Sequence, residues 1–362
     1  MGPKTDITVA FVALSVRGAM GQYISALARP LAEAIDLHVF VPAHFAGKVG
    51  NAKVHFFKTG TSHTKALVRF LNPLTARSIW LTIKNFKPDV IHLFNGEGYP
   101  WALLWAHWAW KDSVPLLVTV HDPEPHPGNF WEALNARLRR YTLLRAKSVH
   151  VHAQCFTETM KKLGVKDMVV IPHGSFAPQF LQHKREGVNR EPLALFFGRI
   201  ERYKGLDILV KAGLLLNGRI KIAIAGPGKI PSKILRKIED HPGIFELHNR
   251  YLSDKEVAIL FQRASVCVLP YHQATQSSVP LIAAAFGVPV VATAVGAFPE
   301  DIKRVNGIIV PPGNPELLAQ AIEKGINLKP VYPAELEFDN IAKQFYSWYK
   351  GVVSFCDVHK DL

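Results

Sequence analysis

Short apolar runs alternate with amphipathic stretches along almost the whole chain. The runs of the first half lie at residues 7–14, 36–43, 89–95, 115–122 and 148–154. Those of the second half lie at residues 193–200, 221–228, 245–251, 265–271, 288–294 and 307–312. Each run is short and rich in β-branched residues, which is typical of strands buried on both faces of a parallel sheet. The stretches between them, such as 206–217 and 254–264, predict helices. The pattern therefore predicts an α/β fold of two doubly wound, Rossmann-like domains that bind ligands at the carboxyl ends of their strands.

Interruptions of this pattern predict the domain boundaries. Residues 179–192 are polar and charged and end in Pro192, just before the next apolar run, so we interpret them as a linker. We expect one domain at residues 1–182 and a second at residues 190–335. The remaining residues 336–362 predict an amphipathic helix. Its apolar face would carry Ile341, Phe345, Trp348 and Tyr349.

Charge and cysteine content narrow the possible functions. The 362 residues carry a formal net charge of +14, which implies anionic partners such as nucleic acid, a phosphorylated substrate or an anionic membrane. We recognise no nucleic-acid-binding module, so nucleic acid is not expected as a partner. The three cysteines have no paired spacing, which argues against a disulfide scaffold or a zinc site and fits a reducing compartment. We predict neither a signal peptide nor a spanning helix, because no apolar run reaches about 18 residues.

Two cations lie on a short turn between a predicted strand and a predicted helix. Arg199 follows the apolar run that ends at Phe197, and Lys204 precedes the helix by two residues. Backbone N–H groups and the helix dipole favour an anion at such a turn. An Arg and a Lys added there would form a clamp for a diphosphate. The alternative is that both are ordinary solvated surface cations.

A second stretch, at residues 272–287, predicts a further anion site. Pro280 suits the first turn of a helix whose N-cap is Ser277 or Ser278, and the helix that follows is small and apolar. A buried helix that begins in a polar loop favours an anion, although an ordinary buried αβ unit would have the same pattern. The glycine-rich turn with Gly226 and Gly228 is a weak signal. It matches neither GxGxxG nor the P-loop, which argues against a dehydrogenase and a P-loop kinase.

His121 ends a predicted strand, where α/β sheets place their chemistry. With Asp122, Glu124 and His126 it resembles a metal cluster, but the two prolines and the mixed spacing argue against one. No DxD pair is present to hold Mg²⁺ against a diphosphate, so we expect neither a metal nor another cofactor. The alternative for His121 is a hydrogen-bonded loop residue. Near the N-terminus, Gly18 and Gly21 open a helix and allow a ligand to approach the backbone closely, or else form a simple turn.

Taken in order, the motifs from Val169 to Pro312 resemble the retaining, nucleotide-sugar-dependent glycosyltransferases of the GT-B fold, often called family 4. The resemblance implies two Rossmann-like domains that face a cleft. The second domain would hold the nucleotide diphosphate, the first would hold the acceptor, and the helix at 336–362 would cross back onto the first domain.

The resemblance also assigns roles to individual residues. It implies catalytic roles for His121, near the donor sugar and the acceptor, and for Arg199 and Lys204, which match the family's diphosphate-binding pair. The implied substrate-binding residues are Gly18, Gly21, Gly226, Gly228, Asn249, Arg250, Tyr251, Thr275, Gln276, Ser277 and Ser278. The family commonly has two Glu eight residues apart, and those positions are Ala274 and Ile282 here. This form of the loop is similar to a subgroup found among polysaccharide-assembly transferases.

The expected function is therefore metal-independent, retaining transfer of a sugar from a nucleotide diphosphate sugar to a glycan or lipid-linked acceptor. Two alternatives stay open. One is a non-catalytic relative that binds sugar nucleotides, which the missing Glu pair favours slightly. The other is a sugar-nucleotide epimerase or hydrolase of the same fold.

Three stretches predict peripheral contact with an anionic membrane, on the inner face of the cell membrane. Residues 61–87 and 137–147 mix basic residues with apolar ones, and residues 99–111 carry four tryptophans. Basic residues beside exposed aromatic groups are typical of interfacial helices. The alternative for the tryptophan stretch is a helix of the protein core.

Overall fold

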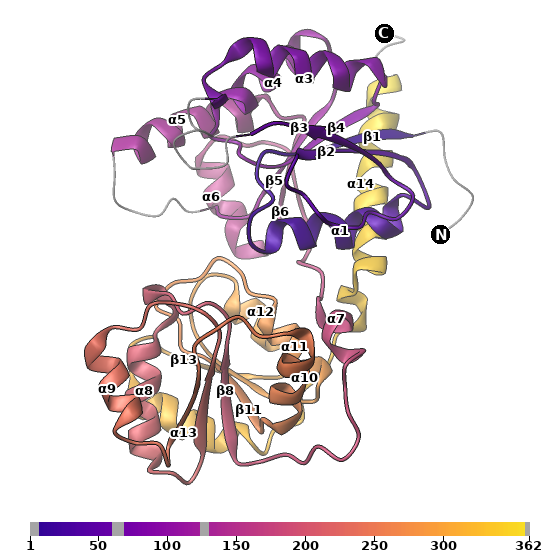
Figure 1. Cartoon of the computed structure of the whole chain (residues 1–362). Helices are drawn as coiled ribbons and strands as arrows, with labels where there is room; N and C mark the ends of the chain where they lie inside the picture. The colour runs from indigo at the N-terminus through magenta and orange to yellow at the C-terminus, as the bar shows by residue number, and fades with distance from the viewer. Residues whose placement is uncertain (1–6, 60–68, 124–129, 359–362) are drawn as a thin grey trace. The chain divides into compact units, whose positions relative to one another are not determined.

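The computed structural model of the chain describes residues 7–59, 69–123 and 130–358. The chain divides into two compact units, one formed by residues 1–174 with 338–362 and the other by residues 175–337 (Figure 1). Within the described residues, no helix combines the length and the apolar character that crossing a membrane would require.

The described part of the first unit contains a seven-stranded parallel sheet in the order β3-β2-β1-β4-β5-β6-β7. Its strands are β1 (Thr8–Ala13), β2 (Asp36–Pro42), β3 (Lys53–Phe57), β4 (Val90–Asn95), β5 (Leu116–Val120), β6 (Ser148–Val151) and β7 (Met168–Val170). The central strands are buried along nearly their whole length, because helices cover both faces of the sheet. Because all these strands run parallel, their carboxyl ends lie at the same edge of the sheet.

The helices of this unit are α1 (Ala19–Leu31), α3 (Pro73–Asn85), α4 (Pro100–Lys111), α5 (Phe130–Arg145), α6 (Thr157–Lys162) and α14 (Phe338–Val358). Asn72 caps α3 by accepting hydrogen bonds from the backbone of Leu74 and Thr75. The indole of Trp101 donates to the carbonyl of Asn72, the N-cap of α3, and that of Trp105 to the carbonyl of Ala76 within α3, so these two buried tryptophans belong to the core.

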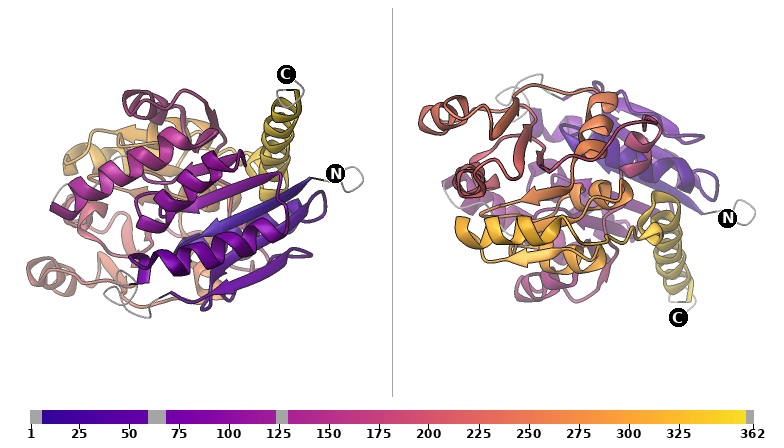
Figure 2. Two further views of the ribbon diagram at one scale, coloured as in Figure 1. Left: turned by 90° about the horizontal axis from the view of Figure 1, so that it is seen from above. Right: turned by 90° about the horizontal axis from the view of Figure 1, so that it is seen from below.

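The C-terminal helix α14 is an integral part of the first unit. It lies along α1 and beside β1, as two further views show (Figure 2). Phe345 and Tyr349 are fully buried on its apolar face, which the spacing of apolar residues predicts.

The second unit contains, within the described residues, a six-stranded parallel sheet in the order β10-β9-β8-β11-β12-β13. Its strands are β8 (Leu193–Phe197), β9 (Lys221–Ala225), β10 (Phe245–His248), β11 (Val266–Leu269), β12 (Val290–Thr293) and β13 (Ile308–Val310). Its helices are α7 (Ala177–Leu181), α8 (Leu206–Leu216), α9 (Ser232–Glu239), α10 (Asp254–Arg263), α11 (Val279–Ala285), α12 (Phe298–Arg304) and α13 (Pro315–Gly325). The predicted fold class, two doubly wound parallel-sheet domains, is confirmed.

The segment that the sequence suggests as a linker, 179–192, is bound to the second unit. Helix α7 packs on α10 and α11, and the Gln179 amide donates to the Asp254 carboxylate at 3.0 Å. Arg190 donates to two backbone carbonyls of the same unit. The first boundary thus lies between residues 174 and 175, earlier than the expected position at 182, because these hydrogen bonds fix a stretch whose polarity alone indicates a linker.

Candidate active site

The turn after β8 holds the two cations that the sequence singles out. β8 ends at Phe197, and Gly198 continues its pairing with β9 by donating to the Ala225 carbonyl at 2.9 Å. Gly198 has φ 123°, and a Cβ placed there would lie 2.9 Å from Nζ of Lys204. The short 3₁₀ helix η2 (Arg202–Lys204) and Gly205 in the left-handed conformation turn the chain back into α8. Lys204 is thereby directed over Gly198, at the carboxyl end of the strand.

Arg199 lies close enough to Lys204 to affect the pKa of the Lys204 ammonium group. The pKa of Lys204 is lowered to about 8, mainly by burial and also by the nearby Arg199 guanidinium. Arg199 itself is exposed, with its guanidinium 3.7 Å from the Glu201 carboxylate. The structure therefore brings the two predicted residues together as a pair of cations, one largely buried and the other in solvent.

Gly226 and Gly228 belong to a close contact between the β8 and β9 loops. A Cβ on Gly226 would lie 2.2 Å from the carbonyl oxygen of Gly198, and a Cβ on Gly228 would lie 2.2 Å from that of Ile200. Asn249 accepts a hydrogen bond from the Gly228 N–H at 3.0 Å. This packing alone accounts for both glycines, whether or not a ligand approaches them.

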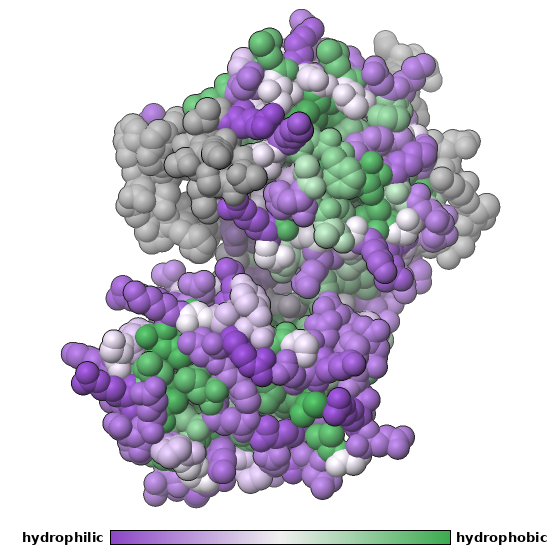
Figure 3. Space-filling view, viewed as in Figure 1, coloured by the Kyte–Doolittle hydropathy of each residue, from purple (hydrophilic) through white to green (hydrophobic). Residues whose placement is uncertain are grey.

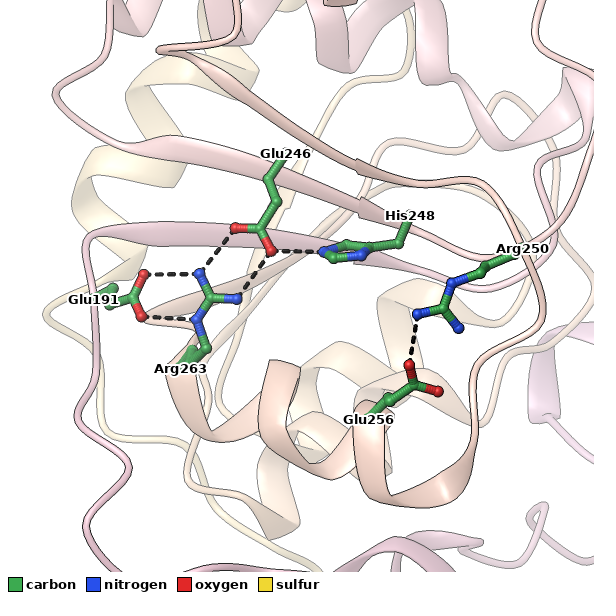
Figure 4. Close-up of polar contacts among 6 residues, drawn as sticks. All are labelled: Glu191, Glu246, His248, Arg250, Glu256 and Arg263. Carbon is green, nitrogen blue, oxygen red and sulfur yellow. Dashed lines mark hydrogen bonds and ion pairs between the residues drawn. The ribbon is translucent and has the colours of Figure 1, made fainter.

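The stretch Asn249–Tyr251 follows β10 within a network of ion pairs. Arg250 pairs with Glu256 at 2.5 Å, while Arg263 binds both Glu191 and Glu246 (Figure 4). Glu256 is also the partner of Ser253 in the capping box of α10. Asn249 and Arg250 are thus held by protein groups, whereas the ring of Tyr251 is 81% exposed.

The loop with Thr275, Gln276, Ser277 and Ser278 leads into the buried helix α11. Ser278 is the N-cap residue, one of the two predicted candidates, but Ser277 is the residue whose Oγ accepts from a backbone N–H, that of Val279 at 3.3 Å. The backbone of Ala274 packs against Gly296, where a Cβ would lie 1.8 Å from the Ala274 carbonyl oxygen. Ile282, at one of the two positions where the family has Glu, is buried in α11.

A pocket of about 790 Å³ lies beside η2 in the second unit. It is lined by Ile200, Glu201, Arg202, Tyr203, Leu206, Asp207, Lys229, Pro231, Ile234, His272 and Gln273. Arg199 and Lys204 are not among these residues, so the pocket is distinct from the space between the two cations.

In the first unit, His121 directly follows β5 at the carboxyl edge of the sheet. Its Nδ1 lies 3.1 Å from Nε2 of His152, which follows β6, and His173 follows β7. Burial lowers the pKa of His121 to about 3, and the neighbouring His173 contributes in the same direction. The sequence analysis missed His152 and His173, which follow β6 and β7, the next two strands of the sheet after β5.

Gly18 and Gly21 lie at the start of α1, at the same edge of the sheet. Gly18 is the N-cap with φ 61°, and a Cβ there would meet no atom within 4 Å. At Gly21, a Cβ would lie 3.1 Å from the Val16 carbonyl oxygen. Only Gly18 thus has open space before it.

The described residues contain no group of three or more His, Cys, Asp or Glu side chains arranged to hold a metal ion. Two members of the metal cluster considered in the sequence, Glu124 and His126, lie outside the described residues.

Both halves of the chain match known domain families. Residues 18–174 match a glycosyl transferase 4-like domain, and residues 191–327 match the glycosyl transferases group 1. Both matched models are glycosyltransferase domains. The expectation of a glycosyltransferase is confirmed at this level.

Curated relatives match parts of this chain. An uncharacterized glycosyltransferase of Methanocaldococcus jannaschii is 30% identical over 182 residues, which cover 44% of this chain and 45% of the relative. A D-inositol 3-phosphate glycosyltransferase of Geodermatophilus obscurus is 31% identical over 270 residues, 65% of this chain and 58% of the relative. The alignments thus span about half the length of these relatives.

Solved structures resemble nearly the whole chain. Sucrose-phosphate synthase from Thermosynechococcus elongatus has a TM-score of 0.70 at 17% identity, covering 96% of this chain and 99% of its own. Anabaena HepE in complex with UDP has a TM-score of 0.69 at 17% identity, covering 98% and 100%. At these identities the likeness establishes the fold, that of the GT-B glycosyltransferases.

Proposed function

We propose that this chain transfers a sugar from a nucleotide diphosphate sugar to a glycan or lipid-linked acceptor. The pairing of Arg199 with Lys204 carries the proposal. Burying an ammonium group beside a guanidinium is unfavourable unless an anion binds between them. A diphosphate fits, since Arg can hold two of its oxygens and Lys supplies a point charge. The matches to glycosyltransferase domains support the same activity.

In the proposed reaction the leaving diphosphate gains negative charge as its bond to the sugar breaks. Arg199 and Lys204 stabilise that charge, and the loop with Ser277 offers small polar groups beside it. Two protein cations then do what a metal ion would otherwise do, so the proposed mechanism requires no metal.

Transfer is proposed to retain the anomeric configuration. Ala274 and the buried Ile282, at the positions where the family commonly has Glu, supply no carboxylate that could act as a nucleophile. A same-face reaction needs none: the acceptor oxygen bonds to the anomeric carbon, the bond to the leaving phosphate breaks, and that phosphate takes the acceptor's proton. His121 is proposed to bind a sugar hydroxyl.

The donor base is proposed to lie near Tyr251. HepE from Anabaena was solved with UDP and with UDP-glucose, which supports a nucleotide sugar as the donor here. The exposed Tyr251 ring is free to stack on a base, whereas Asn249 and Arg250 are engaged by Gly228 and Glu256.

We further propose that the first unit binds an anionic membrane through α3, from the inner face of the cell membrane. Leu74 and Leu81 are exposed with Arg77 between them, and apolar and polar side chains are interspersed over the top of this unit (Figure 3). This is the composition of an interfacial helix. Two residues from the predicted membrane-binding stretches are not included in this surface: Lys84 pairs with Asp112, and the Trp101 indole lies in the core. Lys65, from the same stretches, lies outside the described residues.

A thermal-shift panel of UDP, GDP and ADP sugars, followed by an assay of nucleotide release with and without lipid acceptor, tests the proposal. We expect one nucleotide to stabilise the protein and acceptor to accelerate its release. The missing acids at Ala274 and Ile282 favour a second candidate, binding without turnover, which would show stabilisation but no release. Release that is independent of acceptor would instead indicate an epimerase or hydrolase.

A further inference from the structure

A buried chain of hydrogen bonds runs through the core of the first unit and ends at His121. The donor and acceptor roles in this chain can be assigned from the backbone carbonyl of Ile171, just after β7, because a carbonyl can only accept hydrogen bonds. Nε2 of His150 lies 2.8 Å from this oxygen, and Nδ1 of His152 lies 3.2 Å from it. Each of these two nitrogens must therefore carry a proton.

Burial fixes the protonation state of the two rings. His150 and His152 are 0% and 2% exposed, and burial lowers the pKa of both, that of His150 to about 4. At neutral pH each ring is neutral and carries a single proton. Because that proton faces Ile171, the other nitrogen of each ring must be an acceptor.

The branch through His150 is consistent with this assignment at every step. Nδ1 of His150 accepts from the Thr119 hydroxyl at 3.0 Å, so the Thr119 oxygen is left to accept from Nε2 of His92 at 2.7 Å. Nδ1 of His92 then accepts from the hydroxyl of Tyr349 on α14, also at 2.7 Å. No donor faces another donor along this branch.

The branch through His152 leads to His121. Nε2 of His152 is an acceptor, so the contact at 3.1 Å requires that Nδ1 of His121 donate. His121 is then neutral with its second nitrogen, Nε2, unprotonated. That atom is buried and forms no hydrogen bond of acceptable geometry with the described residues. A hydrogen bond to the backbone of Phe94 favours a protonated His121 ring and opposes part of the lowering of its pKa.

We propose that His152 is a positioning residue that holds His121 in the tautomer protonated on Nδ1, so that Nε2 serves as the hydrogen-bond acceptor for a sugar hydroxyl. The assignment of a sugar hydroxyl as the donor rests on the proposed function. The assignment of the tautomer does not, because it follows from the Ile171 carbonyl and the sequence of contacts alone.

Nitrogen NMR of the ligand-free protein, labelled with ¹⁵N-histidine, tests the tautomer directly. We expect a pyrrole-type shift for Nδ1 of His121 and a pyridine-type shift for Nε2, assigned by their loss in His121→Gln. A pyrrole-type Nε2 would overturn the proposal. This measurement needs no substrate, so its outcome is separate from that of the transfer assay.

Variants of His152 test the positioning role. His152→Phe removes the acceptor, and we expect the His121 proton to move to Nε2 and kcat to fall about 100-fold, with the donor KM changed by less than about threefold. His152→Gln places an amide oxygen near the position of Nε2 and should restore both the tautomer and most of kcat.

Tyr349→Phe is the matched control, because it removes one buried hydrogen bond from the other branch. It should leave the His121 shifts unchanged and kcat within about twofold. A loss of kcat in His152→Phe with an unchanged His121 tautomer, or an equal loss in Tyr349→Phe, would reduce His152 to a packing residue and overturn the proposal.

Discussion

The amino group of Lys204 lies over the ring of Tyr271, with Nζ 4.9 Å from the ring centroid. Such a contact stabilises an ammonium group through the ring's negative face, but it does not replace the water that burial removes. The lowered pKa of Lys204 is the result. Binding of an anion should therefore stabilise the charged form of Lys204. The first two predictions concern this effect.

Arg199→Ala and Lys204→Ala should each weaken binding of the donor diphosphate. Loss of one hydrogen-bonding partner to a phosphate charge costs about 1.5–3 kcal/mol, or about 10- to 150-fold in affinity. Titration calorimetry with the nucleotide selected by the thermal-shift panel measures this. Arg219→Ala, which removes an exposed Arg paired with Glu323 in the same unit, is the control and should bind normally. Unchanged affinity in both clamp variants would refute the assignment.

The protonation of Lys204 should make both donor binding and stability depend on pH. Its pKa of about 8 in the folded protein lies below the ordinary 10.5, so the unfolded chain binds more protons between these values. The contribution of this group to stability therefore rises with pH from about 8 to about 10.5. Donor affinity should fall above pH 8, approaching about tenfold per pH unit, because the cation is lost.

Calorimetry across pH 7–10, in buffers of different ionisation enthalpy, should detect proton uptake on donor binding. Lys204→Arg, which stays charged over this range, should abolish that uptake. The same pH profile in the Arg variant would assign the titration to another group.

Gly226→Ala should destabilise the second unit by about 2–4 kcal/mol. Gly226 has φ 138°, and a Cβ would lie 2.2 Å from the Gly198 carbonyl oxygen, so the β8 and β9 loops would have to separate. Gly218→Ala is the matched control: Gly218 has φ 77°, but a Cβ there would meet no atom within 4 Å, and only backbone strain of about 1 kcal/mol is expected. Chemical denaturation compares the two, and equal losses would contradict the close contact.

Transfer should continue in excess EDTA. The proposed chemistry uses Arg199 and Lys204 where a metal-dependent enzyme would bind Mg²⁺ or Mn²⁺. The initial rate with and without chelator, before and after metal addition, measures this. A complete loss that Mn²⁺ restores would show that a metal takes part.

Leu74→Asp should weaken binding to anionic vesicles. Leu74 is 77% exposed on α3 beside Arg77, and a carboxylate there would both remove apolar contact and oppose the surface charge, where each cation contributes about 1 kcal/mol. Sedimentation with anionic and neutral vesicles over a salt series provides the measurement. Leu215→Asp, an exposed leucine of the second unit, should bind as the unchanged protein does. Negligible binding of the unchanged protein at low salt would refute the idea.

Most strands of both sheets were predictable from sequence, because strands buried on both faces are continuously apolar. β3 and β7 were not among the predicted runs, since β3 is only partly buried and β7 has three residues. The Arg199–Lys204 pair was predictable as well, since the turn between β8 and α8 is short and both residues lie on it. His152 and His173 could not be found so directly. Their proximity to His121 depends on the order of β5, β6 and β7 in the sheet, which a list of strands along the chain does not contain.

Two local patterns could not be interpreted without contacts from distant parts of the chain. Residues 179–192 have the polarity of a linker, but the hydrogen bonds of Gln179 and Arg190 reach residues more than 70 positions away. Likewise, the tryptophan stretch is compatible with an interfacial helix or with a core helix. Trp101 and Trp105 belong to the core, where the backbone carbonyls of Asn72 and Ala76 accept their N–H groups. In each case a distant segment satisfies a polar group that the local pattern leaves exposed.

The course of the chain makes the second unit an insertion with adjoining ends. Ser175 donates its N–H to the Leu336 carbonyl at 2.8 Å, so the first and last residues of this unit lie next to each other. The two residues of the first unit that flank the insertion are also in contact, because a Cβ on Gly174 would lie 2.6 Å from the Phe338 ring. Residues 175–337 can therefore be cloned as a free module for donor-binding studies. The first unit can be made continuous by joining Gly174 to Phe338 through a short linker.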